Sequence, residues 1–562
     1  MKLTGAEIVV RTLIEQGVTD VFGYPGGQII NVYDALYKYR DEINHILTAH
    51  EQGASHAADG YARATGKVGV CIATSGPGAT NLVTGIATAM LDSVPMVAIT
   101  GNVPCSLIGK DSFQEIDITG ITLPITKHNY FVNKIEDLAD TIREAFAIAK
   151  SGRPGPVLVD VPKDVQVATF DYEPKQPFDK IPMPIAKEDK ISEAIKLVNE
   201  AKRPYIYIGG GAAGLGLGEE IVALAEKIDA VIGCTFMGLS AIPDGCPRFL
   251  GMQGMHGRYA SSIAQNEADL IIGIGVRFSD RATGNVAKFA KNSKIIQLDP
   301  DFSEINKNVV VDVGVVGDVE YSFRKIAAEC NSDKKPQWIS RVEEIKAEEK
   351  RIEAELSAES KTILPPQKVF DVINARKPKG TVIVTDVGQH QMWTAQCVKF
   401  DRTRRFVSSG GLGTMGFGLG AAIGARVATG DTTVLITGDG SFGMNLQELA
   451  TVAMYNIPVI IVIMNNGVLG MVRQWQTLFF GGRYSNTVLT DRKTDFVKLA
   501  EAFGVVGMRA STQEEFDSAF AKALELNCPV VIDTIIDKDE FVTPMLPPGG
   551  SVDQIITKVE KK

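Results

Sequence analysis

Short apolar runs of strand length alternate with helical segments along almost the whole chain. The runs are apolar on both faces, and many are followed closely by glycine, aspartate or asparagine. Strands that are buried on both faces and separated by helices are typical of parallel sheets. The sequence therefore predicts an α/β fold built from doubly wound parallel sheets. The candidate strands are Val68–Thr74, Met96–Thr100, Val157–Val161, Tyr205–Ile208, Leu270–Ile274, Ile295–Leu298, Val382–Thr385, Val434–Thr437 and Val459–Met464.

Two segments interrupt this alternation. Residues 166–186 carry four prolines and little periodicity, and residues 331–366 contain a dense charge run that we interpret as a solvated helix. A chain of 562 residues has room for three or four domains, because one domain usually takes about 100–200 residues. The predicted division is 1–165 for the first domain, 166–186 for a linker, 187–335 for the middle domain, 336–366 for a charged helical linker, 367–540 for the third domain and 541–562 for a tail.

The first and third segments resemble each other. Each contains a strand, a glycine-rich turn, a helix, a proline, a second strand and an asparagine. Gly76 and Pro95 are 19 positions apart, and Gly438 and Pro458 are 20 apart. Generic βαβ units can look alike by chance, but the shared asparagine and the A-T-A-M and A-T-V-A-M sequences favour duplicated outer domains. We therefore expect two related outer domains around a Rossmann-like middle domain.

The composition excludes several classes of function. The net charge is −9, which argues against nucleic acid as the main partner, and the longest apolar run, residues 458–464, is far shorter than a membrane span. Seven scattered cysteines without C-x-x-C predict free thiols, and six histidines without H-x-x-x-H make a zinc site improbable. Acidic residues interrupt the N-terminus, where Thr4 and Glu7 form a capping-box pattern instead of a signal peptide. We expect a cytoplasmic enzyme.

One paired motif carries the chemistry. Gly438-Asp439-Gly440 ends a predicted strand, and Asn466 follows the next strand 27 positions after Asp439. A βαβ unit takes about 30 residues, so both polar groups are expected at the same carboxyl edge of one sheet. A carboxylate, an amide oxygen and a loop carbonyl suit a Mg²⁺ ion that also binds a diphosphate, and a glycine-rich turn at a helix N-terminus favours the anion. The alternative is a turn aspartate that caps a helix.

This motif resembles the metal–diphosphate motif of thiamine-diphosphate-dependent enzymes. The resemblance implies Asp439, Asn466 and the Val468 carbonyl as ligands of Mg²⁺. It also implies that Glu51, in the sequence His50-Glu51-Gln52-Gly53-Ala54, activates the cofactor's aminopyrimidine ring. That chemistry requires a carboxyl group that donates to a ring nitrogen in a low-dielectric site. The alternative for Glu51 is an N-terminal acid that interacts favourably with a helix dipole.

Further segments are similar to the catalytic subunits of the acetohydroxyacid synthase (acetolactate synthase) family. The most specific are Phe113-Gln-Glu115 followed by Thr126-Lys-His-Asn129, and Met471-Val-Arg-Gln-Trp475 just after Asn466. The resemblance implies that pyruvate is decarboxylated and its hydroxyethyl unit is condensed with a second 2-keto acid. The products would be 2-acetolactate or, with 2-ketobutyrate, 2-aceto-2-hydroxybutyrate, in the first common step of valine, leucine and isoleucine biosynthesis.

The resemblance also implies individual site residues. Thiamine diphosphate would contact Pro25, Glu51, Gly76, Asn81, Gly388, Gln389, His390, Gly413, Met415, Gly438, Asp439, Gly440, Ser441, Asn466, Val468, Leu469, Gly470 and Met471. The implied catalytic residues are Glu51, Gly27, Gln114 and Lys163, and the implied substrate pocket contains Phe113, Arg281, Met471 and Trp475. An arginine can hold a keto-acid carboxylate with two hydrogen bonds. The alternatives are that the apolar members belong to the core, that Lys163 merely ends a strand, and that Arg281 pairs with Asp280.

The middle segment contains a glycine-rich turn after the Tyr205–Ile208 strand. Residues 209–214 satisfy G-x-G-x-x-G, but the acidic residue expected about 20 positions later, Asp229, precedes a strand instead of ending one. A nicotinamide site is therefore doubtful, and the resemblance implies a structural FAD. The implied FAD contacts are Gly209, Gly210, Gly211, Gly214, Thr235, Phe236, Met237, Gly254, Met255, His256, Gly275, Val276, Arg277, Arg281, Asp299, Asp318 and Val319.

The resemblance also implies partner subunits, and it leaves two alternative functions. Members of the family pair the first domain of one subunit with the third domain of another, and many are tetramers. The resemblance therefore implies at least a homodimer, and a small regulatory subunit as a further partner. A related pyruvate decarboxylase or pyruvate oxidase on the same scaffold is the alternative enzyme. A non-catalytic nucleotide-binding scaffold is the alternative from another class, and the joint presence of Glu51 and Asp439 argues against it.

Overall fold

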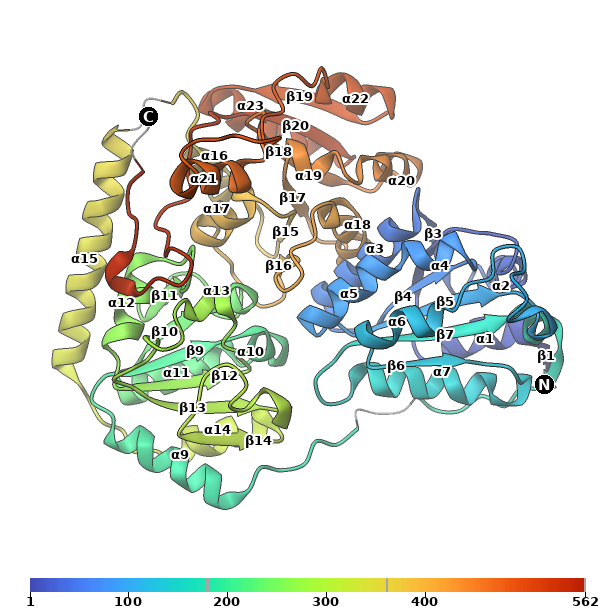
Figure 1. Cartoon of the computed structure of the whole chain (residues 1–562), viewed down its shortest axis with the longest axis horizontal. Helices are drawn as coiled ribbons and strands as arrows, with labels where there is room; N and C mark the ends of the chain where they lie inside the picture. Colours follow the sequence, from blue (N-terminus) through green and yellow to red (C-terminus); the bar gives the residue numbers. More distant parts are fainter. Residues whose placement is uncertain (178–180, 360–361, 560–562) are drawn as a thin grey trace.

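The computed structural model describes residues 1–177, 181–359 and 362–559. These residues form three six-stranded parallel sheets, each with helices against its faces (Figure 1). The first domain lies at the right of that view, the third at the top and the middle domain at the lower left. The predicted α/β class is confirmed, and each candidate strand lies in a parallel sheet with ends within two residues of the predicted ones.

The two outer domains have the same strand order. The first sheet has the order β3 (Asn44–Leu47), β2 (Asp20–Gly23), β4 (Gly69–Ala73), β5 (Met96–Asn102), β7 (Pro156–Pro162), β6 (His128–Phe131). The third has the order β16 (Phe406–Val407), β15 (Val382–Thr385), β17 (Thr433–Gly438), β18 (Val459–Asn465), β20 (Val530–Ile535), β19 (Val506–Ala510). Identical crossovers confirm the predicted relationship between the outer domains.

The middle sheet has a different order. It runs β11 (Phe249–Met252), β10 (Val231–Cys234), β9 (Pro204–Ile208), β12 (Leu270–Ile274), β13 (Lys294–Asp299), β14 (Val313–Val316). Counted along the chain this is the 3-2-1-4-5-6 order of a Rossmann fold, so the predicted Rossmann-like middle domain is confirmed. Its chain reversal between β9 and β12 places two loops side by side at the carboxyl edge, where such sheets bind ligands.

The helices cover the faces of these sheets. In the first domain they are α1 (Gly5–Glu15), α2 (Ile30–Lys38), α3 (Glu51–Thr65), α4 (Pro77–Asn81), α5 (Val83–Asp92), α6 (Ile118–Thr122), α7 (Ile135–Lys150) and α8 (Lys163–Val167), and β1 (Lys2–Thr4) pairs with β8 (Thr169–Asp171). In the middle domain they are α9 (Glu188–Glu200), α10 (Gly210–Leu215), α11 (Gly218–Ile228), α12 (Tyr259–Glu267), α13 (Asp280–Thr283) and α14 (Val319–Glu329). The third domain has α16 (Pro366–Arg376), α17 (Gln389–Cys397), α18 (Phe417–Thr429), α19 (Asp439–Phe442), α20 (Leu449–Met454), α21 (Gly470–Phe479), α22 (Phe496–Ala502) and α23 (Gln513–Leu526).

Helices α3 and α18 join the first and third domains through small residues. A Cβ atom at Gly60 would overlap the backbone of Ala421, and one at Gly424 would overlap the backbone of Ala57. Residues of both helices belong to one buried apolar cluster, which also includes strands of both outer sheets. The two outer domains of one chain therefore share a continuous core, and alanine and glycine permit this close helix packing.

The charged segment after the middle domain forms the long helix α15 (Pro336–Glu359). Its first half is not fully solvated, because Trp338, Val342 and Ile345 are buried against the middle domain. Glu349 further along receives two hydrogen bonds from Arg258. Residues 178–180 of the proposed linker, 360–361 of the charged segment and 560–562 of the tail lie outside the described residues. The predicted domain boundaries themselves stay predictions.

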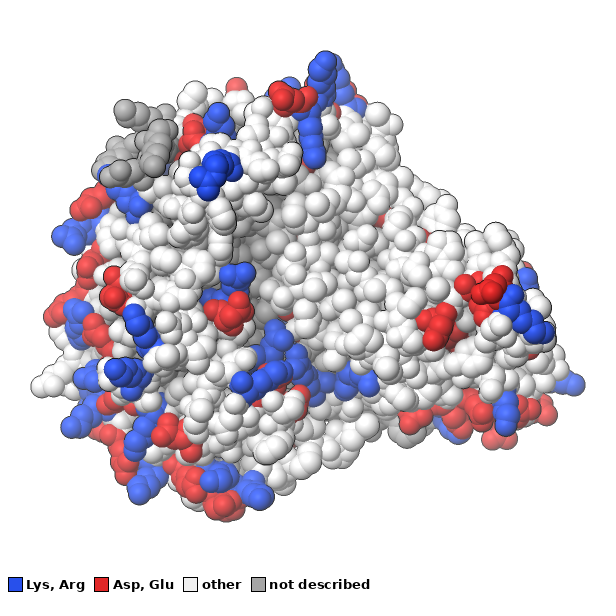
Figure 2. Space-filling model, in the orientation of Figure 1, with Lys and Arg blue, Asp and Glu red and all other residues white. Residues whose placement is uncertain are grey.

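The start of α1 and the cysteines follow the expectations from the sequence. Thr4 and Glu7 form the predicted capping box at the start of α1, and the seven cysteines are all free thiols. Within residues 1–177, 181–359 and 362–559, no helix is long and apolar enough to cross a membrane. On the face drawn in Figure 2, basic and acidic side chains intermingle around the outer edge of the middle domain, whereas the surface between the first and third domains carries few charges.

Candidate active site

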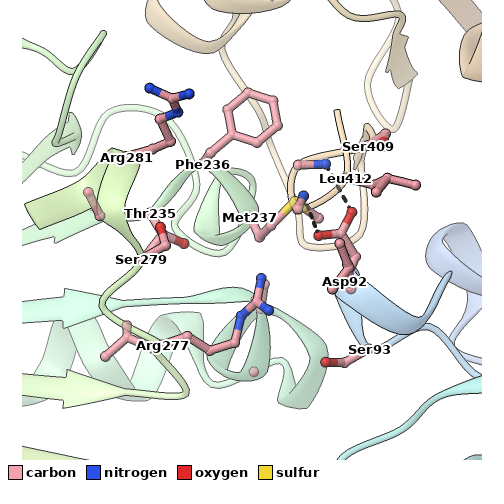
Figure 3. Close-up of a pocket in the computed structure, with 18 of the residues that line it drawn as sticks. Asp92, Ser93, Thr235, Phe236, Met237, Arg277, Ser279, Arg281, Ser409 and Leu412 are labelled. Carbon is pink, nitrogen blue, oxygen red and sulfur yellow. Dashed lines mark hydrogen bonds between the residues drawn. The ribbon is translucent and has the colours of Figure 1, made fainter. Parts of the chain in front are cut away.

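A cavity of about 2010 Å³ lies where the three domains meet, and it is the centre of the candidate site. Figure 3 shows middle-domain side chains such as Arg277 and Arg281 on one side of it, and Asp92 of the first domain beside the third-domain loop on the other. Most of the predicted FAD residues line this cavity. They are Gly210, Gly211, Gly214, Thr235, Phe236, Met237, Met255, His256, Gly275, Val276, Arg277, Arg281, Asp299, Asp318 and Val319.

Two glycine turns form the middle-domain wall of the cavity. The Gly211 N–H donates to the Gly275 carbonyl at 3.3 Å, and a Cβ at Gly275, where φ is +58°, would lie 2.6 Å from the Gly211 Cα. Gly209 and Gly254 do not line the cavity. A Cβ at Gly209 would overlap the Gly275 carbonyl, and one at Gly254 would lie 2.5 Å from the Arg281 carbonyl. Both therefore allow backbones to pack behind the wall, so the structure brings them next to the site but not into it.

Acidic residues of the middle domain divide into two roles. Asp229 pairs with Arg248 at 2.6 Å and accepts the Lys335 N–H at 2.7 Å, so it ties α11 to the start of α15. This structural role agrees with the interpretation that Asp229 is not a ribose ligand. Asp299 ends β13 at the cavity, where burial raises the pKa of its carboxyl to about 6.

The third-domain residues gather at the carboxyl edge of their sheet. Asp439 opens α19 directly after β17, and burial raises the pKa of its carboxyl to about 6. Asn466 follows β18, and its side-chain oxygen accepts the Val468 N–H at 3.2 Å. A Cβ at Gly440 would lie 3.9 Å from the Met415 Cε, so the G-D-G turn packs beside the Met415 loop. Glycines here let backbone, side chains and a ligand approach closely.

The rest of the predicted third-domain set lies in the same place. Gly388, Gly413, Met415 and Met471 line the cavity itself. Ser441 Oγ donates to the Val387 carbonyl at 2.7 Å, and a Cβ at Gly438 would lie 2.9 Å from His390 Nδ1. Three more residues lie directly behind them. Leu469 packs against Gly440, and Gln389 packs against Gly470 and accepts a hydrogen bond from Asn466. Four strand ends, those of β15, β16, β17 and β18, thus supply one connected site.

The oxygen atoms of this edge fit a magnesium ion. Asp439 supplies a carboxylate, Asn466 an amide oxygen and Val468 a main-chain carbonyl, which are hard ligands. Among the described residues, no group of three or more His, Cys, Asp or Glu side chains is placed to hold a metal ion. A transition-metal site built from nitrogen or sulfur is therefore not found in that part of the chain, whereas the mixed oxygen set remains chemically suitable for Mg²⁺.

The first-domain residues form a second group at the edge of the first sheet. Glu51 opens α3, and its Oε2 accepts a hydrogen bond from Asn81 Nδ2 at 2.9 Å. A Cβ at Gly76 would lie 2.9 Å from the Gln114 carbonyl, and Lys163 Nζ donates to the Gly27 carbonyl at 3.2 Å. Pro25 lies in the turn after β2 that also contains Gly26, which packs against Thr74. We call Gly27, Glu51, Gly76, Asn81, Gln114 and Lys163 the first-domain half-site.

The first-domain half-site does not line the central cavity of its own chain. None of its six residues is among those that border the cavity. Five of the predicted third-domain residues do border it, namely Gly388, Gly413, Met415, Met471 and Trp475, and the predicted metal ligands Asp439, Asn466 and Val468 lie just outside this lining. Phe113, beside Gln114, has 83% of its surface exposed, so it is not a core residue in the single chain. We call Gly388, Gly413, Met415, Asp439, Asn466, Val468 and Met471 the third-domain half-site. One chain therefore presents two separate halves, the first-domain half-site and the third-domain half-site.

Comparison with known proteins places the chain in a family. Family models match residues 3–121 (thiamine pyrophosphate enzyme, N-terminal TPP binding domain), 191–326 (central domain) and 386–534 (C-terminal TPP binding domain). A probable acetolactate synthase large subunit of Methanocaldococcus jannaschii is 47% identical over 99% of this chain and 96% of its own. The acetolactate synthase isozyme 2 large subunit of Escherichia coli is 45% identical over 99% and 100%. The chain belongs to the acetolactate synthase large-subunit family. The resemblance inferred from the motifs is confirmed, and so is thiamine diphosphate (thiamine pyrophosphate) as the cofactor of its outer domains.

In this acetolactate synthase family member, Arg281, Met471 and Trp475 face the cavity together. The Arg281 guanidinium lies 5.9 Å from the centre of the Trp475 ring, and Arg281 Nη1 is 3.5 Å from Met255 Sδ. Arg281 also lies 3.7 Å from Asp280, but this pair is largely exposed and leaves the guanidinium beside the cavity. Met471 and Trp475 are only partly buried and border the cavity, and Met471 also packs against the apolar core.

Sequence reasoning missed Glu448, which precedes α20. Its fully buried carboxylate accepts the N–H groups of Ala49 at 3.1 Å and His50 at 3.0 Å, the two residues before Glu51. Burial raises the pKa of the Glu448 carboxyl. The third domain of a chain thus holds the peptide from which that chain's Glu51 projects. No motif signals this contact, because Glu448 lies about 400 positions from its partners and both hydrogen-bond donors are main-chain N–H groups.

Asp92 is a second missed residue, and it joins the first domain to the cavity loop. Its carboxylate accepts the N–H groups of Gly410 at 2.9 Å and Gly411 at 2.8 Å, as the dashed lines in Figure 3 show, and a hydrogen bond from Arg63 at 3.0 Å. The Arg63 and Asp92 side chains are both almost completely buried. Since Gly413 and Met415 follow in the same loop, Asp92 supports the cofactor side of the cavity.

We predict that Asp92→Ala lowers the free energy of unfolding by about 1.5–3 kcal/mol, because Gly410, Gly411 and Arg63 lose a charged hydrogen-bond partner, while Arg63 keeps its second buried partner, Asp59. Urea unfolding followed by circular dichroism measures the change. The control is Asp517→Ala, which breaks an exposed pair with Arg376 and should cost at most about 1 kcal/mol. Equal, small losses in both variants would contradict the role assigned to Asp92.

Proposed function

We propose that this chain is an acetolactate synthase catalytic subunit, which decarboxylates pyruvate and joins its two-carbon unit to a second 2-keto acid. The observation that carries the proposal is the joint position of Arg281 and Trp475 on the cavity wall that Met415 and Met471 also line. A guanidinium can bind the carboxylate of the acceptor with two hydrogen bonds. The Trp475 ring offers an apolar surface, on which one additional methylene changes the binding energy by about 1–3 kcal/mol.

Each half-site has its own task in the proposal. Asp439, Asn466 and the Val468 carbonyl would hold Mg²⁺ and, through it, the diphosphate, while Gly413 and Met415 would support the rest of the cofactor. Bound thiamine diphosphate would supply the nucleophilic carbon and take up the electron pair that remains when CO₂ leaves. Glu51 would hold a proton at its carboxyl group. Asn81 occupies Oε2, and beside Oε1 lies Gly78, where a Cβ would approach to 3.2 Å, so a side chain there would narrow the site.

Three residues around Glu51 would act on the substrate. Gln114 can donate an amide hydrogen bond to a developing oxyanion, and the Gly27 turn leaves open space, since a Cβ there would meet no atom within 4 Å. Lys163 adds positive charge next to Gly27, 3.2 Å from its carbonyl. This arrangement favours binding and decarboxylation of an anionic 2-keto acid at the edge of the first sheet.

We further propose that the middle domain binds FAD. The two opposed glycine turns, together with Arg277, Ser279 and Asp318 on the same wall, form a long cavity with both polar and apolar contacts. The reaction involves no net redox change, so FAD would stabilise the cavity wall. Purified, gently handled protein should show flavin absorbance, and failure of the apoprotein to bind added FAD would contradict this part of the proposal.

The separation of the two half-sites supports a homo-oligomer with shared active sites. A second copy could bring its first-domain half-site to the third-domain half-site of the first copy, and the weakly charged surface between the outer domains (Figure 2) would suit such an interface. The proposed shared site needs at least a dimer, and a tetramer would also provide it. Since the relatives are named as large subunits, a smaller regulatory subunit is the second proposed partner.

Product analysis tests the proposed reaction. Purified protein with thiamine diphosphate, Mg²⁺ and FAD should convert pyruvate mainly to acetolactate, and competition with 2-ketobutyrate measures the preference for the acceptor. Acetaldehyde or acetyl phosphate as the main product would instead indicate the related decarboxylase or oxidase. The same mixture without Mg²⁺ is the control for the metal, and pyruvate consumption should then stop.

A further inference from the structure

The helix that carries Met471 and Trp475 has a second, buried face that the proposed reaction leaves unexplained. Met471 and Trp475, four positions apart, line the cavity, whereas Arg473 and Gln474 between them are buried on the other side. Arg473 donates to the Lys538 carbonyl at 2.9 Å and to Asp539 at 2.7 Å. The R-Q pair within M-V-R-Q-W therefore faces the chain segment that follows β20.

Gln474 is fully buried and uses both ends of its amide. Its Nε2 donates to the Val542 carbonyl at 3.0 Å, and its Oε1 accepts the Val542 N–H at 2.9 Å. Oε1 also accepts a hydrogen bond from Gln389 Nε2 at 3.0 Å. Because Val542 offers one donor and one acceptor, the amide of Gln474 cannot be reversed without placing like groups against each other.

The orientation of the Gln389 side-chain amide is also determined by its hydrogen-bond partners. Gln389 Nε2 donates to Gln474 and to the Glu540 carbonyl at 3.0 Å, so Gln389 must turn its Oε1 the other way. There Oε1 accepts a hydrogen bond from Asn466 Nδ2 at 3.2 Å. The Asn466 nitrogen is thereby committed to Gln389, and its oxygen is left for the side of Asp439 and Val468. Gly470 permits the contact, since a Cβ there would overlap Gln389.

Val542 belongs to a segment that connects two domains. We call residues 540–546 the strap. It leaves the third domain at Glu540, is held by Gln474 at Val542, and reaches the middle domain at Leu546, whose N–H donates to the Met255 carbonyl at 2.7 Å. Met255 lines the central cavity. The strap thus runs from the Asn466 side of the site to the FAD side.

We propose that Gln474 is a positioning residue that couples the strap to the metal ligand Asn466 through Gln389. The inference rests on the proposed function, because it assigns Asn466 to Mg²⁺. Docking of the strap orients Gln474, Gln474 orients Gln389, and Gln389 presents the Asn466 oxygen to the metal. By linkage, Mg²⁺ bound at Asn466 stabilises the docked strap to the same extent.

The first test measures cofactor binding and not turnover. Thiamine diphosphate binding is followed by tryptophan fluorescence while Mg²⁺ is titrated. Gln474→Met, which keeps the length of the side chain but removes both amide functions, should raise the half-saturating Mg²⁺ concentration about 10–100-fold, the usual effect of removing a partner of a metal ligand. The control is Gln265→Met, which removes a buried glutamine of α12 whose nitrogen has no hydrogen-bond partner; its Mg²⁺ dependence should equal that of the wild type.

The second test measures the strap. Mg²⁺ and thiamine diphosphate together should slow proteolysis within residues 540–556 of the wild type, and Gln474→Met should abolish that protection. If Gln474→Met does not fold, Gln474→Glu decides, because it keeps the acceptor for Gln389 and loses the donor to Val542. It should lose protection of the strap and, by the same linkage, raise the half-saturating Mg²⁺ concentration.

Different results would contradict the proposed coupling and the proposed function. An unchanged Mg²⁺ requirement in a folded Gln474→Met, or in a Gln474→Glu protein that has lost protection of the strap, overturns the coupling while the proposed function stands. If the wild-type protein itself binds no thiamine diphosphate in the presence of Mg²⁺, the proposed function fails first, and the coupling fails with it.

Discussion

Glu51→Gln should lower the rate of acetolactate formation by about 10²–10⁴-fold, the usual contribution of a positioned acid or base. Glutamine keeps the shape of Glu51 and can still accept the hydrogen bond from Asn81, but it cannot exchange a proton with the aminopyrimidine ring. Thiamine diphosphate binding, which depends mainly on the third-domain half-site, should change little. Steady-state assays with pyruvate and a separate binding titration give the two quantities.

The control for this prediction is Glu136→Gln. Glu136 also lies in the first turn of a helix, α7, so its replacement removes the same favourable interaction with a helix dipole without touching the proposed site. Its rate should equal that of the wild type. If Glu51→Gln behaved like Glu136→Gln, Glu51 would be no more than a helix-terminal acid, and the proposed activation of the cofactor would have to be abandoned.

Asp439→Ala should raise the Mg²⁺ concentration needed for thiamine diphosphate binding by at least about 100-fold, since a direct ligand matters no less than the residues that orient one. Asp439 is the one carboxylate in the proposed ligand set, and it stands at the first position of α19. Acetolactate formation at ordinary Mg²⁺ concentrations should fall below detection. Titration of Mg²⁺ at fixed thiamine diphosphate, monitored by fluorescence, gives the value.

A capping aspartate of the same domain provides the comparison. Asp495 accepts the N–H groups of Val497 and Lys498 at the start of α22. Asp495→Ala should cost about 0.5–2 kcal/mol of stability but leave the Mg²⁺ requirement unchanged. A normal requirement in Asp439→Ala would mean that Asp439 is a turn residue. Mixing the inactive Glu51→Gln and Asp439→Ala proteins under subunit exchange should restore activity, because some mixed oligomers then contain one site with both residues intact.

The sequence was sufficient for the fold because the decisive signals are local. Apolar runs such as Val382–Thr385 and Leu270–Ile274 match strands residue for residue, and their burial on both faces leaves little choice but parallel sheets. The same holds for Asp439 and Asn466, because each follows a strand end and neighbouring parallel strands bring such ends together. Periodicity and spacing therefore place the third-domain half-site without tertiary information.

Contacts between distant segments could not be predicted in this way. Glu448 binds main-chain N–H groups about 400 positions away, and Asp92 binds a glycine loop more than 300 positions away. Backbone donors have no sequence signature, so nothing in the chain distinguishes these two acids from ordinary helix-end residues. Gln474 stood within a recognised motif, yet only the structure separates its strap-binding face from the cavity face of Trp475. The half-burial of α15 likewise depends on three apolar residues hidden in a charge run.

The close packing of α3 against α18 has a consequence for how two copies would fit. Helix α3 begins at Glu51, and α18 begins just after Met415, so this contact sets the spacing between the two half-sites of a single chain. In the shared-site arrangement that we propose, both half-sites must meet their counterparts on a second copy at once. A side chain in place of Gly60 or Gly424 would force the helices apart. Because both copies carry the same change, the spacing would alter equally in both, and both shared active sites would be displaced together.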